Sequence, residues 1–93
     1  MERTQKMVER FVKARGWDKE EPDHVVKSIS IESAELLELF QWGSPTVKEI
    51  QNNPEKFEEL KGELADVLIY SFHLLTLKLL NYCENPTYIN PKL

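Results

Sequence analysis

Apolar residues recur along this chain at spacings of three and four, and no stretch alternates convincingly as a half-buried strand would. The pattern predicts four helices, interrupted wherever glycine or proline breaks it. Their expected ranges are about 3–15, 23–41, 45–51 and 54–81. We therefore expect an all-α protein, an antiparallel helical bundle, with residues 1–84 as one domain and 85–93 as an irregular, proline-containing tail.

Local signals set the expected helix ends. Gly16 stands where a left-handed C-terminal cap is expected for the first helix, and a polar connection follows it. Each later helix begins near a proline with a capping side chain beside it. The expected N-caps are Asp23, Ser44 and Asn53.

Two of the predicted helices carry acidic pairs on their apolar faces. Glu32 and Glu35 interrupt the stripe of the second helix, and Glu63 interrupts that of the last helix, with Asp66 beside it on the edge. The other stripe members are Val25, Ser28, Ile29, Leu36 and Leu39, and then Leu60, Val67, Tyr70, Leu74 and Leu77. Acids three apart are common on solvated faces, but two such pairs on core-facing stripes are far more specific than one.

These acids indicate a metal site. Burying unpaired carboxylates is costly, so four acids that converge inside a helical bundle imply a compensating cation. Oxygen-only ligands favour Mg²⁺, with Mn²⁺ as the alternative. Glu38 lies three residues beyond Glu35, and its position on the helix surface is no longer in line with Glu32. We interpret it either as a peripheral member of the site or as solvent-facing.

Length and charge narrow the class of protein. A chain of 93 residues buries a limited fraction of its surface, so association of copies is a natural way to complete its core. The net charge is −4 and the basic residues are scattered, which disfavours nucleic-acid binding. No apolar run approaches about 18 residues, and Cys83 is the single cysteine, so neither a membrane span nor an internal disulfide is expected. We expect a cytoplasmic protein.

The strings ISIESAELLELFQW at 29–42 and ELADVLIY at 63–70 resemble the all-α nucleoside triphosphate pyrophosphohydrolases, the MazG-like group. The chain looks closest to the small dCTP pyrophosphatase subtype, whose hallmark is E-x-x-E, a spacer and then E-x-x-D. The resemblance covers about residues 7–77. It implies hydrolysis of a nucleoside triphosphate, in particular a deoxynucleotide, to a monophosphate and pyrophosphate, as house-cleaning of the nucleotide pool.

The resemblance also implies roles for individual residues. It implies Mg²⁺ binding by the two acidic pairs, and proton acceptance from the attacking water by Glu35 or Glu38. The positions that match substrate-binding residues of the family are Trp17, His24, Trp42 and Tyr70. For the two tryptophans the alternative is a hydrophobic plug at a helix end, and for His24 it is an ordinary residue in the first turn of a helix.

The sequence after the last helix departs from the family pattern. Relatives continue into a helix whose lysine, asparagine and Lys-Tyr-Pro end contact phosphates, whereas residues 85–93 here read NPTYINPKL. Candidates for replacing those contacts are Lys78, Asn81 and Lys92, or Lys27 and Lys61 of a neighbouring subunit. The departure keeps a second function class open, a catalytically degenerate helical oligomer or interaction module that retains the metal site.

A di-iron carboxylate bundle is disfavoured. Such proteins need Glu-x-x-His on continuous helix, and here that spacing occurs at Glu21 and His24, where Pro22 interrupts it.

The chain carries more apolar residues than three principal helices can cover, which predicts a homodimer or homotetramer that completes the bundle. The apolar residues that belong to neither stripe, and that are left over in this sense, are Met7, Phe11, Leu37, Phe40, Leu68, Ile69, Phe72, Leu75, Leu79 and Leu80.

Overall fold

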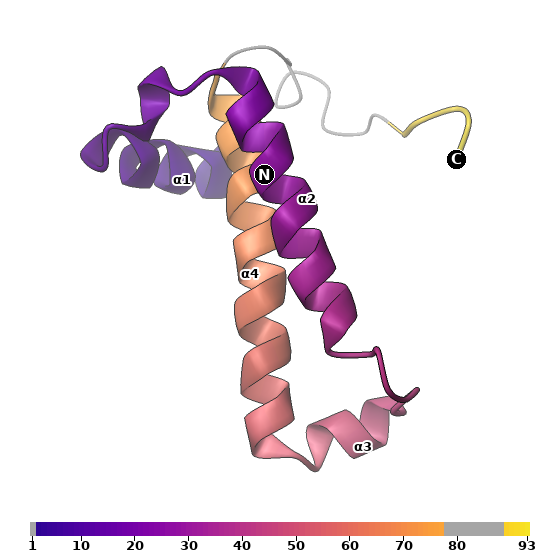
Figure 1. The fold of residues 1–93 in the computed structure, drawn as a ribbon. Helices are drawn as coiled ribbons and strands as arrows, with labels where there is room; N and C mark the ends of the chain where they lie inside the picture. The colour runs from indigo at the N-terminus through magenta and orange to yellow at the C-terminus, as the bar shows by residue number, and fades with distance from the viewer. Residues whose placement is uncertain (1, 78–88) are drawn as a thin grey trace.

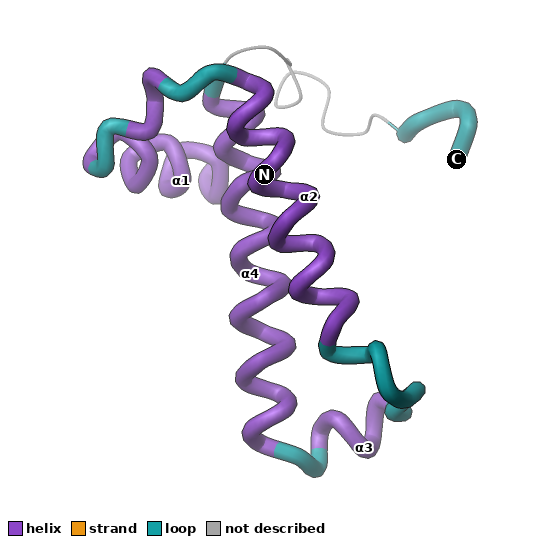
Figure 2. The backbone as a smooth tube through the Cα atoms, viewed as in Figure 1, coloured by secondary structure: helices purple, strands orange, loops and turns teal. Residues whose placement is uncertain are grey.

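The structure of the chain, a computed structural model, describes residues 2–77 and 89–93. Its elements are α1 (Glu2–Ala14), the short 3-10 helix η1 (Trp17–Lys19), α2 (Pro22–Glu38), α3 (Val47–Gln51) and α4 (Pro54–Thr76). The described residues contain no strand, which confirms the predicted all-α class (Figure 1, Figure 2). No helix among them is both long and apolar enough to cross a membrane.

α2 and α4 lie side by side and run in opposite directions (Figure 1). α1 packs across the C-terminal half of α4, η1 leads the chain back to α2, and α3 packs near the start of α4. The two predicted stripes are buried or half-buried, with Glu35 and the edge residue Asp66 exposed. The described helices form one antiparallel pair with α1 packed across it, which has fewer packed helices than the predicted bundle. Completion of the bundle by a second copy stays a prediction.

The two long helices end earlier than the sequence predicts. α2 ends at Glu38 rather than Gln41, because the N–H groups of residues 39–41 donate to carbonyls three residues back at 3.3, 2.9 and 3.2 Å. This tighter spacing closes the last turn and redirects the chain toward α3. α4 ends at Thr76, short of the expected Asn81, which lies outside the described residues.

Two of the expected caps are confirmed. Gly16 has a φ of 73°, the left-handed conformation that glycine adopts without steric cost. The side chain of Asn53 accepts a hydrogen bond from the Lys56 N–H at 3.1 Å. The prediction for Asp23 is wrong: α2 already begins at Pro22, whose missing N–H is no loss in the first turn of a helix.

The cap of α3 also differs from the prediction, since Thr46 takes the place expected for Ser44. The Thr46 hydroxyl accepts from the Glu49 N–H at 3.2 Å, and the Glu49 carboxylate accepts from the Thr46 N–H at 3.4 Å. This reciprocal capping box satisfies two donors at once, whereas a cap at Ser44 would satisfy one. α3 therefore begins two residues later than expected, at Val47.

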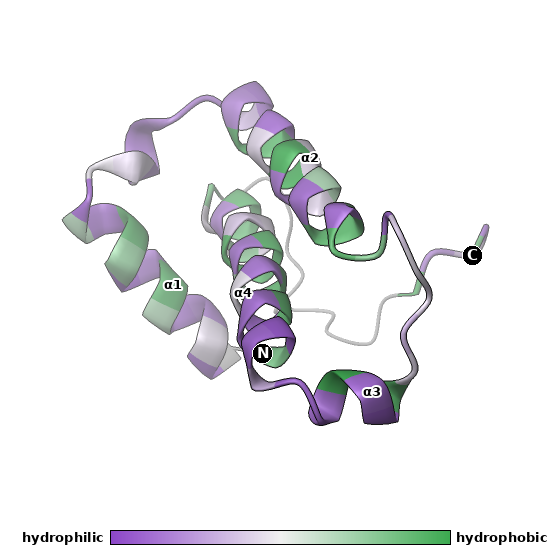
Figure 3. Cartoon of the chain, turned by 60° about the horizontal axis from the view of Figure 1, so that its bottom comes forward, coloured by the Kyte–Doolittle hydropathy of each residue, from purple (hydrophilic) through white to green (hydrophobic). Residues whose placement is uncertain are grey.

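The core of the described chain is small. Its fully buried side chains are Val12, Val25 and His73. Apolar segments remain interspersed with polar ones along the helices (Figure 3). Of the residues predicted to be left over, Met7, Leu37, Phe40 and Leu68 are exposed and Phe11, Ile69, Phe72 and Leu75 are half-buried. Leu79, Leu80, Cys83 and the predicted domain boundary after residue 84 lie outside the described residues.

Candidate functional site

Glu32, Glu63 and Asp66 come together where α2 packs against α4. One carboxylate oxygen of each lies within 4.8 Å of the others. Glu32 and Glu63 are half-buried because they sit in the facing stripes, whereas Asp66 lies on the stripe edge and is exposed. Antiparallel pairing places the middle of α2 against the middle of α4, and this brings acids from distant parts of the sequence into one group.

Glu35 joins these three acids from the next turn of α2. Its carboxyl group lies close enough to Glu32 and Glu63 to raise the pKa of both. We call Glu32, Glu35, Glu63 and Asp66 the acidic cluster. Glu38, further along α2, adds negative charge near Glu63 and lies at the periphery of the cluster.

Among the described residues, no positive charge pairs with the acidic cluster. Partial burial raises the pKa of Glu32 and of Glu63 above the usual glutamate value, and the interaction with Glu35 and repulsion from neighbouring carboxylates raise both further. Atom Oε2 of each of these two glutamates is buried and has no hydrogen-bond partner in the part of the chain that the structure describes. The ion pairs of the described lysines go to acids outside the cluster.

The residues present fit a hard divalent cation. All the donor atoms are carboxylate oxygens, which Mg²⁺ and Mn²⁺ prefer. Two of these oxygens are buried and unpartnered, so a bound cation would satisfy atoms that nothing else in the described chain satisfies. The acidic cluster is therefore suited to hold a metal ion at the junction of α2 and α4.

The raised pKa values predict that stability without metal falls as the pH rises. The folded state binds the protons of Glu32 and Glu63 more tightly than the unfolded state does. Their contribution is therefore fully present below the unfolded glutamate pKa of 4.5 and is lost as pH rises through the higher folded values. Thermal unfolding in EDTA should show this decline above pH 4.5, and Mg²⁺ should reverse it near neutral pH. A profile in EDTA that rises with pH in this range, or that Glu63→Gln leaves unchanged, would contradict the assignment.

An aromatic group borders the acidic cluster on the side of α1. Tyr70 lies one helical turn beyond Asp66, and its ring stacks on Trp17 with centroids 6.4 Å apart and planes 14° apart. Burial raises the pKa of Tyr70, and the nearby negative charges of Glu32, Glu20 and Asp66 raise it further. Tyr70 thus lies between Trp17 and the acids, where it could line a binding site.

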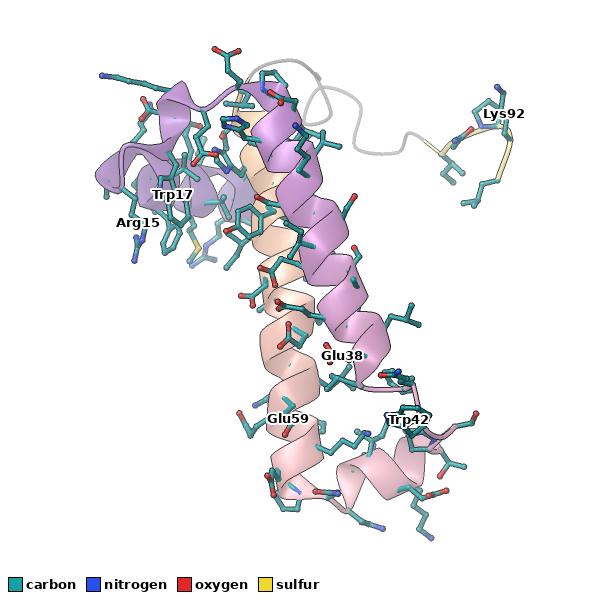
Figure 4. The ribbon with its side chains drawn as sticks, in the orientation of Figure 1. Arg15, Trp17, Glu38, Trp42, Glu59 and Lys92 are labelled. Carbon is teal, nitrogen blue, oxygen red and sulfur yellow. The ribbon has the colours of Figure 1, made fainter. Side chains whose placement is uncertain are left out.

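Trp42 borders the acidic cluster on the opposite side. Its side chain is 90% exposed. It lines an open cavity of about 560 Å³ together with Glu35, Glu38 and Glu63, and a neighbouring cavity of about 530 Å³ that also includes Glu38. Trp17 lies beside α1 and Trp42 beyond the far end of α2 (Figure 4). The two tryptophans of one chain therefore flank the acids from opposite ends and do not face each other.

The other predicted substrate contacts are away from the acidic cluster or outside the described residues. His24 is exposed in the first turn of α2. Lys27 pairs with Asp23 at 3.1 Å and Lys61 with Glu58 at 2.8 Å, and all four side chains are exposed. Lys92 lies in the C-terminal segment, away from α2 and α4 (Figure 4). Lys78 and Asn81 fall outside the described residues.

Two residues near the site were not singled out by the sequence. Lys56 donates to the Leu39 carbonyl at 2.7 Å, which ties the start of α4 to the end of α2, and it is the one cation among the described residues that line the two cavities. His73 is the buried polar residue of the described chain and contacts Trp17. The position of His73, three residues after Tyr70, was the signal in the sequence that could have placed it near the site. No sequence pattern pointed to Lys56.

The fold and site define an all-α protein with an acidic centre between two antiparallel helices. A family model, that of the MazG-like family, matches residues 27–77, which is more than half of the chain. The chain belongs to the MazG-like family, and this membership indicates a function of the nucleotide pyrophosphohydrolase type, with a divalent metal. No curated protein and no solved structure gives a significant match. The match includes the acidic cluster, Trp42 and Tyr70, and begins after Trp17 and His24.

Proposed function

We propose that this protein hydrolyses nucleoside triphosphates, in particular deoxynucleotides, to a monophosphate and pyrophosphate, and so removes unwanted nucleotides from the pool. The observation that carries the proposal is the pair of buried, unpartnered carboxylate oxygens of Glu32 and Glu63 at the centre of four acids. In a chain of the MazG-like family, this arrangement supports a site that binds metal and triphosphate together, with the cation balancing the negative charge of the acids and the phosphates.

The acidic cluster would hold Mg²⁺, with Mn²⁺ as a substitute, and the ion would neutralise charge on the phosphates and polarise them toward attack. The chain itself must accept a proton from the attacking water. We assign this role to Glu38 in preference to Glu35, because Glu35 interacts with both Glu32 and Glu63 within the cluster, whereas Glu38 borders both cavities. Water then adds oxygen to one phosphorus, the bridge between the α and β phosphates breaks, and the departing oxygen takes up a proton.

The nucleobase would stack on one of the two aromatic surfaces that flank the acids. Trp17 and Tyr70 offer one stacking surface and Trp42 offers a second at the other end. His24, which is exposed in the first turn of α2, would contact the nucleotide at the edge of the site. Resemblance to the small dCTP pyrophosphatase subtype makes dCTP the first substrate to test, and base preference remains part of the proposal.

The functional unit would be a homodimer or homotetramer. Phe57, Leu64 and Leu68 are exposed apolar residues of α4 at spacings of seven and four, which places them on one face. A second copy packed there would bury surface that one chain leaves in water and would complete the helical bundle.

The alternative is a catalytically degenerate oligomer or interaction module. What favours it is the scarcity of cations, since Lys56 is the one lysine among the described residues lining the two cavities and its ammonium is already hydrogen-bonded to Leu39. Such a protein would keep the acidic cluster and bind metal without turning over nucleotides.

Pyrophosphate release from each of the four common dNTPs and the four NTPs, with Mg²⁺ and again with EDTA, separates the two functions. The proposed enzyme releases pyrophosphate from at least one nucleotide, and only with metal. If every nucleotide stays intact while Mn²⁺ still binds, the interaction module is the correct interpretation.

A further inference from the structure

His73 is the most buried polar side chain of the described residues, with 0% of its surface exposed. Its Nε2 atom lies 2.9 Å from the carbonyl oxygen of Trp17. Because a carbonyl oxygen only accepts hydrogen bonds, Nε2 carries the proton of this bond. The other ring nitrogen, Nδ1, is buried and has no partner among residues 2–77 and 89–93, so within these residues the contact with Trp17 is the polar interaction that orients the imidazole.

This hydrogen bond ties η1 to a distant part of the chain. Gly16 turns the backbone with its positive φ, and Trp17 then opens η1. The other hydrogen bond to the Trp17 carbonyl is local, from the Glu20 N–H at 3.1 Å. His73 thus fastens the start of the α1–α2 connection to α4.

The same imidazole also holds the indole of Trp17 in a defined orientation. The His73 ring stacks on the indole with centroids 6.3 Å apart, and Phe11 meets the indole edge-on at 5.8 Å. Arg15 covers the ring of Phe11, with its guanidinium carbon 3.5 Å from the ring centroid. Held in this way, Trp17 lies nearly parallel to Tyr70, the aromatic residue that borders the acidic cluster.

We propose that His73 is a positioning residue for the nucleotide site, which holds Trp17 parallel to Tyr70 as an aromatic wall for the nucleobase. It touches neither the phosphates nor the acids and acts through the main chain and indole of Trp17. The inference rests on the proposed function and adds to it a residue that determines how well the base is bound.

Two substitutions separate positioning from simple packing. His73→Leu keeps most of the buried volume but removes the donor, and it also removes the unpartnered Nδ1, so its folding stability should equal or exceed that of the parent. Binding of the base should nevertheless weaken, with KM rising about tenfold and kcat changing less than about twofold. His73→Gln keeps an N–H donor of similar reach and should recover much of the KM. An unchanged KM in His73→Leu, or an equal rise in both variants, would overturn the proposal.

Fluorescence tests the same point without any turnover. The chain has two tryptophans, so Trp42→Phe leaves Trp17 as the sole reporter. In that background His73→Leu should shift the emission to longer wavelength and increase quenching by acrylamide, because the indole loses its anchor, while His73→Gln should stay near the parent. Unchanged emission in His73→Leu rules out the anchoring of Trp17. If the emission shifts but the parent protein hydrolyses no nucleotide, the anchoring stands and the proposed function fails.

Discussion

Replacing Glu63 by glutamine is expected to abolish metal-dependent hydrolysis while leaving the fold intact. Glu63 contributes a buried oxygen without a hydrogen-bond partner among the described residues, and it lies next to the negative charge of Glu35. Loss of an outer partner of a metal ligand alone costs about 10–100-fold in affinity or activity, so loss of a ligand should cost more than about 100-fold. Without metal the variant should be more stable than the parent at neutral pH, because one of the repelling carboxylates is gone.

The matched control is Glu58→Gln on the same helix. Glu58 is exposed and pairs with Lys61 outside the acidic cluster, and exposed pairs contribute little to stability. Its activity and metal affinity should stay close to those of the parent. Activity should be followed as pyrophosphate release, metal binding by Mn²⁺ titration, and folding by thermal unfolding in EDTA. Full activity in Glu63→Gln would disprove the metal assignment, whereas equal losses in both variants would point to a general effect of charge.

Leu68→Glu is expected to dissociate the protein into 10.9 kDa chains at micromolar concentration, whereas the parent should scatter light as at least twice that mass. Leu68 is 49% exposed in the single chain and lies with Leu64 and Phe57 on one face of α4. A glutamate there would place an unpaired charge in the interface, at a cost of at least about 3 kcal/mol, or more than about 100-fold in association. Because Leu68 lies about 200° around the helix from Asp66, it would not act by touching the acids directly.

Val47→Glu is the control for this substitution. Val47 is an apolar residue of α3 that is 73% exposed, and it lies outside the α4 face that carries Leu68. This variant should keep the mass and activity of the parent. A parent protein that is a stable, active monomer would refute the oligomer, and an unchanged mass in Leu68→Glu would show that the interface lies elsewhere.

The central part of the fold followed from the sequence because its helix pattern is strong. The stripe residues Val25, Leu36, Leu60 and Val67 have the spacing of helix faces that bury against each other, and they are buried or half-buried where α2 meets α4. The acids interrupt these stripes near the middle of each helix, so a pairing that buries the stripes with the two helices side by side along their lengths also gathers the acids. Their convergence was therefore predictable without knowledge of the helix crossing.

The aromatic part of the site was less predictable, because it depends on contacts between distant residues. Nothing local in the sequence indicates that His73 bonds to the carbonyl of Trp17 or that Lys56 bonds to that of Leu39. Main-chain carbonyls are acceptors at every residue, so sequence alone does not select one. The helix ends were misplaced for a related reason, since Thr46 competes successfully with Ser44 through a side chain three residues further on.

The most direct test of the central claim is to identify and count the products formed from the best nucleotide of the panel with the full chain and Mg²⁺. We predict nucleoside monophosphate and pyrophosphate in equal amounts, none of either in EDTA, and a loss of more than about 100-fold in Glu63→Gln. Formation of nucleoside diphosphate and inorganic phosphate, or product formation that persists in EDTA, would contradict the claim.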